Sequence, residues 1–318
     1  MISQNTINVY NSALKALARD LGYEAELLYP DGYHWLSDSE KVINVLKTMP
    51  PTTQNNKLFA IKYALNLTDA PPKIFKPYDD YIAIIKDELS KAKADKVKTE
   101  KEEANWLERE DLQIIVDDLK KNLPLKINTM NNYRNVMKYL VLRIHMETPL
   151  RNDLADAKIY FDPDAKQIEQ IALDRKYNYI LVIAPTKAKY INNQYKTKAL
   201  YDQININFSE SLSYDLFHYA KEIIEYTAVA VIDPKQVETT NNLFLVNNER
   251  DKMNRNSYTK FMKSIFAPYE KKISSTMIRH IIVSDVYKLD KEKEEEKKEL
   301  ARKMGHSQAT AYQIYAKV

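Results

Sequence analysis

Residues 1–90 carry apolar side chains at the spacing of amphipathic helices. One stripe recurs every three or four positions and is followed by Gly22, a helix-stop signal: Ile7, Tyr10, Leu14, Leu17 and Leu21. The pattern Ser37-x-x-Glu40 predicts the capped start of a second helix. A third helix is predicted from about Thr52, and a fourth after the prolines at 71, 72 and 77. Four short helices predict a small compact domain.

The stretch that follows has almost no apolar content. Residues 91–103 read KAKADKVKTEKEE, in which Val97 is the only large hydrophobic residue. Such a run is either a helix extension or a solvated linker between domains. We favour a charged linker over 91–104, because a new apolar pattern begins at Trp106. The second domain is then expected over 105–318.

In this second domain the hydrophobic period changes from helical to extended and back. Two or three helices are predicted between Trp106 and Leu142. β-Branched and aromatic runs broken by turn signals then predict a meander of three strands; they lie at 159–161, 178–183 and 200–208. The lysine-rich turn 190–198 leads into the last of these strands.

Helical spacing resumes after the strands. Helices are predicted at 212–224, 257–266 and 274–287. The alternating charges of 288–300 are typical of a solvated helix face, and we assign them no chemistry. The predicted fold is therefore mainly α with a small antiparallel β-sheet, an α+β fold.

Composition excludes several classes of protein. Hydrophobic residues make up 44% and charged residues 29% of the 318 residues, which is typical of a globular chain. No apolar run approaches the roughly eighteen residues of a membrane span, and the N-terminus lacks the basic and apolar pattern of a secretion signal. The chain has no cysteine, which rules out disulfides, thiol nucleophiles and cysteine-bound metal. We expect an intracellular protein that is not secreted.

Glycine content excludes nucleotide cofactors. The chain has three glycines, Gly22, Gly32 and Gly305, so neither an ATP-type nor an NAD-type phosphate loop can be built. The net charge of +4 hints only weakly at nucleic acid, because phosphate binding depends on local basic faces. The many lysine, asparagine and tyrosine residues are explained by an AT-rich genome.

The strongest candidate chemistry lies near the end of the sequence. A Gly305-His306-Ser307 turn is followed by Tyr315, nine residues after the histidine. A tyrosine nucleophile needs cations that hold a phosphate in front of it and an acid for the leaving oxygen. Upstream, Arg151 follows Thr148-Pro149-Leu150, and Arg279 precedes His280 at the start of an apolar helix. Lys196 lies in the lysine-rich turn.

The order Arg151, Lys196, Arg279, His306, Tyr315 resembles the tyrosine recombinases, the integrases that cut and rejoin DNA through a tyrosine. The resemblance covers about 105–318 as the catalytic domain, and 1–90 is similar in size and placement to the helical core-binding domain that clamps DNA. The composition and the Arg-Asn-Asp segment at 151–153 are also similar to recombinases of large DNA viruses and their virophages.

The resemblance implies a role for each residue. Tyr315 attacks the phosphodiester, Arg151, Arg279 and His306 bind the phosphate, and Lys196 protonates the leaving 5′-oxygen. Two planar guanidinium forks suit the charge on the phosphorane oxygens, and no metal or other cofactor is expected. Lys198 stays open as an alternative to Lys196, and Tyr312 as an alternative to Tyr315.

Three features depart from the family pattern. Thr276 stands where the family has a histidine, and threonine cannot shuttle a proton near neutral pH. His280 lies one step further round the helix, so the proton acceptor of Tyr315 is left open, with Ser275 and Thr276 as supporting candidates. Asp153 either buttresses Arg151 or caps a helix. Three residues follow Tyr315, where the family commonly continues with a helix that docks on a neighbouring subunit.

The expected function is site-specific DNA recombination or integration through a 3′-phosphotyrosine. The expected partners are double-stranded DNA and further copies of the chain, as a homotetramer on DNA and a monomer or dimer when free, with no membrane. The site of action would be wherever the target DNA lies, in a host nucleus or in the cytoplasm. Two alternatives are a type IB topoisomerase-like enzyme that relaxes supercoils and a catalytically inactive DNA-binding protein with the same fold.

Overall fold

The computed structural model describes residues 2, 4–23, 33–228, 242–288 and 294–317. The chain divides into two compact units, Met1–Asp95 and Lys96–Val318, so the boundary falls inside the stretch predicted as a linker. The fold is mainly α with one small sheet, which confirms the predicted class. No helix among the described residues is both long and apolar enough to cross a membrane.

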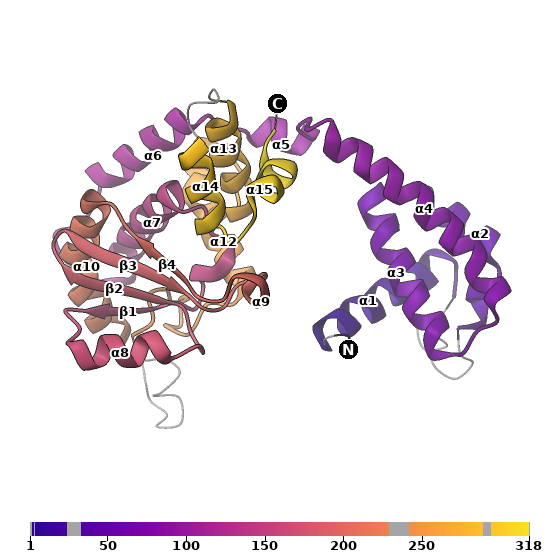
Figure 1. Ribbon diagram of the computed structural model, residues 1–318, viewed down its shortest axis with the longest axis horizontal. Helices are drawn as coiled ribbons and strands as arrows, with labels where there is room; N and C mark the ends of the chain where they lie inside the picture. The colour runs from indigo at the N-terminus through magenta and orange to yellow at the C-terminus, as the bar shows by residue number, and fades with distance from the viewer. Residues whose placement is uncertain (1, 3, 24–32, 229–241, 289–293, 318) are drawn as a thin grey trace. The chain divides into compact units, whose positions relative to one another are not determined.

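In the first unit, the residues that the structure describes form four α-helices around a core of their own (Figure 1). They are α1 (Gln4–Asp20), α2 (Ser39–Leu46), α3 (Pro51–Leu67) and α4 (Pro72–Ala94), with a short 3-10 turn, η2 (His34–Ser37), before α2. Leu14 and Leu17 of the predicted stripe are buried in this core. The buried Tyr78 hydroxyl donates to the carbonyl of Leu36 at 2.7 Å and ties α4 to the turn. The four predicted helices are confirmed.

The predicted cap of the second helix was wrong by one residue. Asp38, not Ser37, is the N-cap, and its side chain accepts from the amide of Lys41 at 3.2 Å. Ser37 instead donates to the carbonyl of His34 at 2.6 Å. A capping oxygen must reach the second or third amide of the helix, and with the helix starting at Ser39 only Asp38 is in position.

The predicted linker 91–104 is mostly helical. Helix α4 continues to Ala94, and α5 (Glu100–Asn105) begins after Thr99, whose side chain and that of Glu102 form a capping box. Lys96, between the two helices, has a positive φ of 52°. Alanine, lysine and glutamate favour helix even without an apolar face, so the lack of hydrophobic residues did not mean an extended chain.

The sheet in the second unit has four strands and is mixed, not a three-stranded antiparallel meander. Its strands lie in the order β1 (Lys158–Phe161), β2 (Tyr179–Ala184), β3 (Lys187–Asn192) and β4 (Ile204–Asn207). The β1–β2 pair is parallel and the other pairs are antiparallel. Parallel neighbours need a crossover connection, and α8 (Ala165–Leu173) supplies it.

The prediction of three strands was wrong because strand β3 was not recognised and the start of β4 was placed too early. The sequence of β3, KAKYIN, has too many polar residues to be recognised as a strand, although its last three residues are buried. The last strand begins at Ile204 and not near Leu200, because the short helix α9 (Lys198–Tyr201) takes up the preceding residues.

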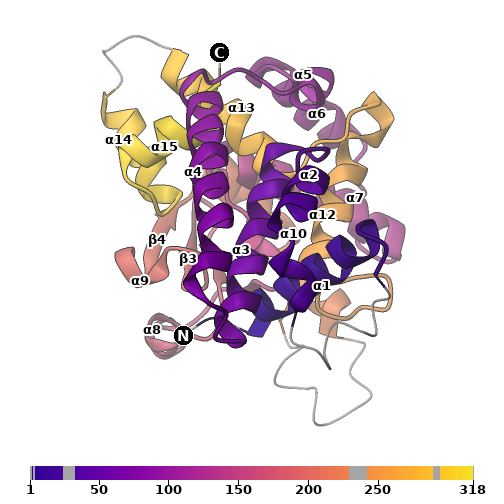
Figure 2. The same cartoon turned by 90° about the vertical axis from the view of Figure 1, so that its right-hand side faces the viewer.

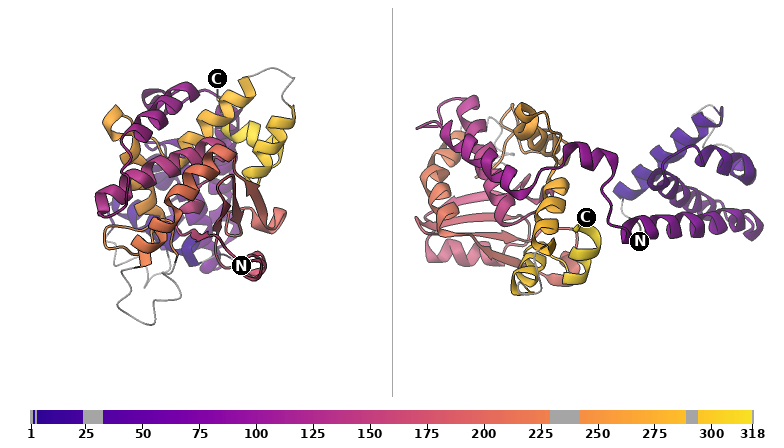
Figure 3. Two further views of the ribbon diagram at one scale, coloured as in Figure 1. Left: turned by 90° about the vertical axis from the view of Figure 1, so that its left-hand side faces the viewer. Right: turned by 90° about the horizontal axis from the view of Figure 1, so that it is seen from above.

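Helices cover the sheet and carry the C-terminal residues. Helix α7 (Met130–Glu147) packs against α6 (Arg109–Lys121), α10 (Glu210–Ala228) and α13 (Ser275–Lys288), and α10 lies on strands β1 to β3. Helix α12 (Arg255–Phe266) follows, and α14 (Glu294–Lys303) and α15 (Gln308–Tyr315) gather at one side of the sheet (Figures 2 and 3).

The helices predicted in this second unit at 212–224, 257–266 and 274–287 are confirmed as α10, α12 and α13 within a few residues. Of the charged stretch 288–300, residues 289–293 lie outside the described residues. Lys288 ends α13, and residues 294–300 belong to α14, which buries Leu300.

Candidate functional site

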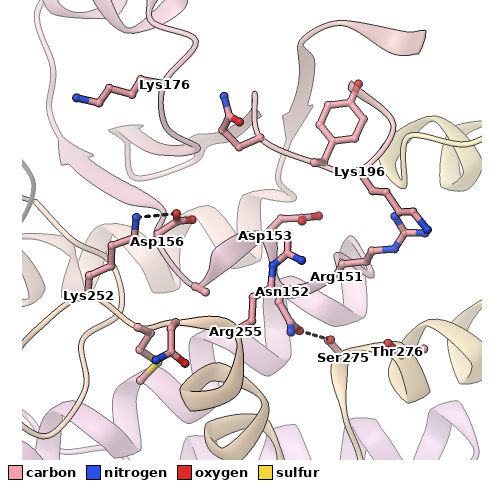
Figure 4. Close-up of a pocket in the computed structure, with 15 residues that line it drawn as sticks. Arg151, Asn152, Asp153, Asp156, Lys176, Lys196, Lys252, Arg255, Ser275 and Thr276 are labelled. Carbon is pink, nitrogen blue, oxygen red and sulfur yellow. Dashed lines mark hydrogen bonds and ion pairs between the residues drawn. The ribbon is translucent and has the colours of Figure 1, made fainter. Parts of the chain in front are cut away.

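A cavity of about 770 Å³ opens where five chain segments of the second unit meet (Figure 4). It is lined by the turn after α7, the loop before β2, the loop after β3, the start of α12 with the residues before it, and the first turn of α13. Five cations face it: Arg151, Lys176, Lys196, Lys252 and Arg255. Two carboxylates, Asp153 and Asp156, also line it, and Asp156 pairs with Lys252 at 3.0 Å. The excess of cations makes the cavity suited to an anion.

Arg151 joins this cavity to Tyr315. Its Nη2 donates to the Tyr315 hydroxyl at 2.9 Å and lies 3.4 Å from His306 Nε2. Helix α7 ends at Glu147, and Pro149 disfavours its continuation, so the chain turns and presents Arg151 just before the 3-10 turn η3 (Asn152–Leu154). Tyr315 closes α15 and is only 3% exposed. The two residues, far apart in sequence, are therefore in direct contact.

Arg279 is buried beside the same tyrosine. It lies in the second turn of α13, is 1% exposed, and has its guanidinium carbon 4.5 Å from the centre of the Tyr315 ring. Its Nε and Nη2 atoms are buried and have no hydrogen-bond partner among the described residues. Burial lowers the pKa of Arg279 to about 10, which still leaves it charged at neutral pH. Two charged donors are thus held ready for an anion.

His306 follows a turn that only glycine fits well. Gly305 has a φ of 65°, and a Cβ there would lie 2.7 Å from Cε2 of Tyr195. Its carbonyl accepts a hydrogen bond from Thr197 Oγ1 at 2.7 Å, which fixes the turn against the loop that bears Lys196. Burial, with the charges of Arg279, Arg151 and Lys196, lowers the pKa of His306 to about 4. His306 is therefore neutral, and its Nε2 accepts from the guanidinium of Arg151.

The two alternatives from the sequence lie outside this cluster. Lys196 lines the cavity, whereas Lys198 donates to Gln194 Oε1 at 2.7 Å and does not line it. Tyr312 is 44% exposed, stacks on Tyr287, and has Lys96 Nζ 2.9 Å from its ring centre. The structure thus brings the side chains of Arg151, Lys196, Arg279, His306 and Tyr315 near one another; their proposed roles stay a prediction.

The supporting residues take different positions. Thr276 is exposed at the cavity wall, and Ser275 Oγ donates to Asn152 Oδ1 at 2.7 Å. The Asp153 carbonyl accepts from the Asn178 side chain at 2.8 Å, and burial raises the pKa of its carboxyl group, opposed by the charges of Arg279 and Arg151. Within the described part of the chain, its carboxylate makes no ion pair with either arginine inside 4.0 Å. Asp153 therefore lies within electrostatic reach of both arginines and accepts a hydrogen bond from the backbone amide of Arg151, without an ion pair to its guanidinium.

Sequence reasoning missed several polar cavity residues, among them Lys176 and Asp156. Asn152 links the Arg151 turn to α13 through Ser275, and Lys252 and Arg255 extend the basic wall. The spacing Lys252-x-x-Arg255 just before a helix was visible in the sequence. Its meaning was not, because nothing in the chain itself says which loops face Arg151.

Comparison of the chain with protein-family models and with curated protein sequences finds no match. The function of the site must therefore be argued from the side chains that form it.

Proposed function

We propose that the protein is a site-specific DNA recombinase or integrase of the tyrosine recombinase type, which cleaves and rejoins DNA through a 3′-phosphotyrosine. One observation carries the proposal: the Arg151 guanidinium donates to the Tyr315 hydroxyl at 2.9 Å, next to the buried, unpartnered donors of Arg279. A nucleophile and two phosphate-binding forks at one point suit phosphoryl transfer to tyrosine.

A phosphodiester is the ligand that best fits the unpaired charges. The Nε and Nη2 atoms of Arg279 are the neighbouring donors of one guanidinium edge, the edge that binds two phosphate oxygens at once. Leaving these two guanidinium donors buried and without hydrogen bonds is costly, and a bound phosphate would relieve that cost. Charge on the non-bridging oxygens grows as the phosphorane forms, so these donors stabilise the transition state more than the ground state.

The reaction is a balanced exchange of esters. Tyr315 Oη forms a bond to phosphorus as the bond from phosphorus to the 5′-oxygen breaks, and Lys196 at the cavity wall gives the leaving oxygen its proton. Rejoining is the reverse step with a 5′-hydroxyl as nucleophile. The phosphodiester energy is kept in the tyrosine ester.

Neutral His306 is the group in this cluster that can accept the tyrosine proton. The cations around it depress its pKa, and a bound phosphate would offset them and make it a better base. The Arg151 hydrogen bond to Oη also stabilises the developing phenolate, so a weak base is sufficient. In this proposal the missing histidine at Thr276 is replaced by His306.

The partners and location follow from this chemistry. The substrate is double-stranded DNA, and recombination between two sites requires a homotetramer, with a monomer or dimer in the free state. The protein acts inside the cell that holds its target DNA. The cationic wall of Lys176, Lys252 and Arg255 would contact phosphates beside the scissile one.

Trapping the covalent intermediate tests the proposal. Duplex oligonucleotides of randomised sequence, each with a nick one or two nucleotides from a possible cleavage site, lose the short 5′-hydroxyl fragment and trap the enzyme. We expect an adduct that survives denaturation, is joined to a 3′-phosphate, and disappears in Tyr315→Phe. Tyr312→Phe is the matched control and should keep the adduct, since Tyr312 is half-exposed and stacked on Tyr287. An unchanged adduct in Tyr315→Phe, or none with wild-type protein, would refute the proposal.

An inactive DNA-binding protein is the second candidate, favoured by the exposed Thr276 at the usual histidine position. It predicts retention of some duplexes from the same pool without a covalent bond. The remaining alternative is tested by incubating the protein with a supercoiled plasmid. Rapid, sequence-independent relaxation by a monomer would indicate a type IB topoisomerase-like enzyme.

A further inference from the structure

The main chain of Tyr315 is held by side chains that do not touch its hydroxyl. His280 Nδ1 lies 3.0 Å from the Tyr315 carbonyl, to which it donates, and Ser284 Oγ donates to the same oxygen at 3.4 Å. Ser284 Oγ also accepts from the amide of Lys317 at 2.7 Å. The His280 and Tyr315 rings are 5.3 Å apart between centres. Helix α13 thus fixes the end of α15 from one side.

The carboxylate of Glu102, in helix α5, lies near two of the residues around the end of α15, His280 and Lys317. One carboxylate oxygen lies 3.8 Å from His280 Nε2, and the other lies 3.5 Å from the Lys317 ammonium. Glu102 is itself fixed, because the amide and hydroxyl of Thr99 donate to it at 2.9 and 3.0 Å. Burial would raise the pKa of Glu102, but the Thr99 hydrogen bonds, Lys317 and His280 together lower it, so the carboxylate is charged at neutral pH.

The segment before Glu102 holds the same helix. Lys317 Nζ also donates to the carbonyl of Val97 at 3.4 Å, and Lys96 covers the ring of Tyr312 one turn before the nucleophile. The side chains of Glu102 and Lys317 are only 19% and 16% exposed, so their ion pair is less screened than a surface pair. Residues 96–102 therefore contact α15 on both sides of its last turn.

We propose that Glu102 is a positioning residue for Tyr315: through Lys317, whose amide is bonded to Ser284, it holds the tyrosine main chain where the hydroxyl meets Arg151. The inference rests on the proposed function. Rate depends steeply on such geometry, since a misplacement of about 1 Å can cost roughly a hundredfold. The first helix of the second unit then belongs to the active site, although it contributes no atom to the chemistry.

A double-mutant cycle separates positioning from helix capping. Glu102→Ala and Lys317→Met should each slow adduct formation about tenfold in a single turnover, without changing DNA affinity. The double variant should be little slower than either single one, because both remove the same contact. Glu103→Ala on the same helix is the control, since its carboxylate reaches only Lys98, at 3.9 Å. Additive effects, or a wild-type rate in Glu102→Ala, would overturn the proposal.

Two conservative substitutions of His280 test independently whether the hydrogen bond to the Tyr315 carbonyl matters. The amide of asparagine can take the place of Nδ1 and donate to the Tyr315 carbonyl, whereas that of glutamine is placed like Nε2 and cannot. His280→Asn should therefore keep the adduct rate within about threefold, and His280→Gln should lose about tenfold. Equal rates in the two variants would contradict a role through that carbonyl.

Fluorine NMR tests positioning even if no DNA is cleaved. With 3-fluorotyrosine at position 315, wild-type protein should give one narrow resonance, and Glu102→Ala should broaden or split it while Glu103→Ala does not. Absence of any adduct in wild-type protein would refute the proposed function alone. An unchanged resonance in Glu102→Ala would refute the positioning role alone.

Discussion

At the scale of single residues, the site is built around guanidinium donors to which the described residues offer no hydrogen bond. Arg279 is among the largest fully buried side chains, and two of its nitrogen atoms have no partner among the described residues. Structures rarely leave buried polar groups unpaired, and each such case calls for an explanation. A phosphate that arrives with the DNA is the explanation we favour.

Arg279→Lys should test whether the guanidinium fork matters. Lysine keeps the charge but cannot offer two coplanar donors, so we expect adduct formation to fall about a hundredfold or more. Single-turnover trapping measures it, with thermal unfolding to show that the fold persists. Arg109→Lys is the control, because Arg109 pairs with Asp285 and is not in the cavity wall. A similar rate for wild type and Arg279→Lys would contradict the proposed role.

His306 makes stability depend on pH in a defined window. Its pKa in the folded protein is about 4, below the usual 6.5, so between those values the unfolded chain binds a proton that the folded chain does not. The free energy of unfolding should therefore fall as pH drops from 6.5 to 4, by about 3 kcal/mol from this residue. Above pH 6.5 the contribution is constant.

Urea unfolding of wild type and His306→Asn at pH 7, 5.5 and 4 isolates this contribution. The variant should lose less stability than wild type as the solution is acidified. His145, buried and with its pKa lowered by burial to about 3, adds a dependence of the same sign that is common to both proteins. A difference between the two proteins that stays constant with pH would contradict the assignment.

At the scale of elements, the turn before α15 sets the position of Tyr315, the proposed nucleophile. Ser307 caps the helix by accepting from the amide of Thr310, and Gly305 adopts a left-handed conformation against Tyr195. The helix is only eight residues long, too short to be stable alone. Its register therefore depends on the turn and on packing against α13 and α14.

Two glycine-to-alanine substitutions separate the cost of backbone strain from the cost of steric overlap. Gly22 has a φ of 83°, and a Cβ added there would have nothing within 4 Å, so Gly22→Ala should cost about 1 to 2 kcal/mol for backbone strain alone. Gly305→Ala adds overlap with the Tyr195 ring, about 1 to 3 kcal/mol more. Urea unfolding of the unit that bears each glycine measures both costs. Equal costs would show that the Tyr195 ring moves aside freely.

The elements also show what the sequence could predict. Helices with an apolar stripe, such as α1 and α10, were visible because burial on one side repeats every three or four residues. Strand β3 was not, since half of its residues are polar and its last three positions are all buried, which breaks the period of two. Thr99-x-x-Glu102 had the pattern of a helix start, but its approach to Lys317 depends on packing between elements far apart in the chain.

The site residues also divide into those that the sequence alone identifies and those that only the folded structure reveals. Arg151, Arg279, His306 and Tyr315 could be named from their order and local context, because the chemistry restricts which residue types serve. The roles of Asn152 and Glu102 could not, since each acts through a contact made only in the folded unit.

At the scale of the molecule, each unit has its own hydrophobic core. Leu14, Leu36 and Tyr78 belong to the first, and Leu140, Phe244 and Ile282 to the second. Separate cores indicate that each unit can fold alone. The five proposed catalytic residues all lie in the second unit.

Fragments 1–95 and 96–318 should therefore both fold, each with a single cooperative unfolding transition by circular dichroism. Fragment 96–318 should still form the adduct with short nicked duplexes, because it holds the whole cluster, and should bind longer DNA more weakly than the full chain. A fragment 96–318 that unfolds, or that folds without forming an adduct while the full chain does, would contradict this division.

The hydrogen bond between Thr197 and the Gly305 carbonyl has a consequence for biosynthesis. It joins neighbours of Lys196 and His306 across 108 residues of chain, so the loop that bears Lys196 is secured only after α14 and α15 have folded. Contacts of such long range form late. A chain still emerging from the ribosome would hold Arg151 and Lys196 without Tyr315, so under the proposed function cleavage would have to wait until the last helices were made.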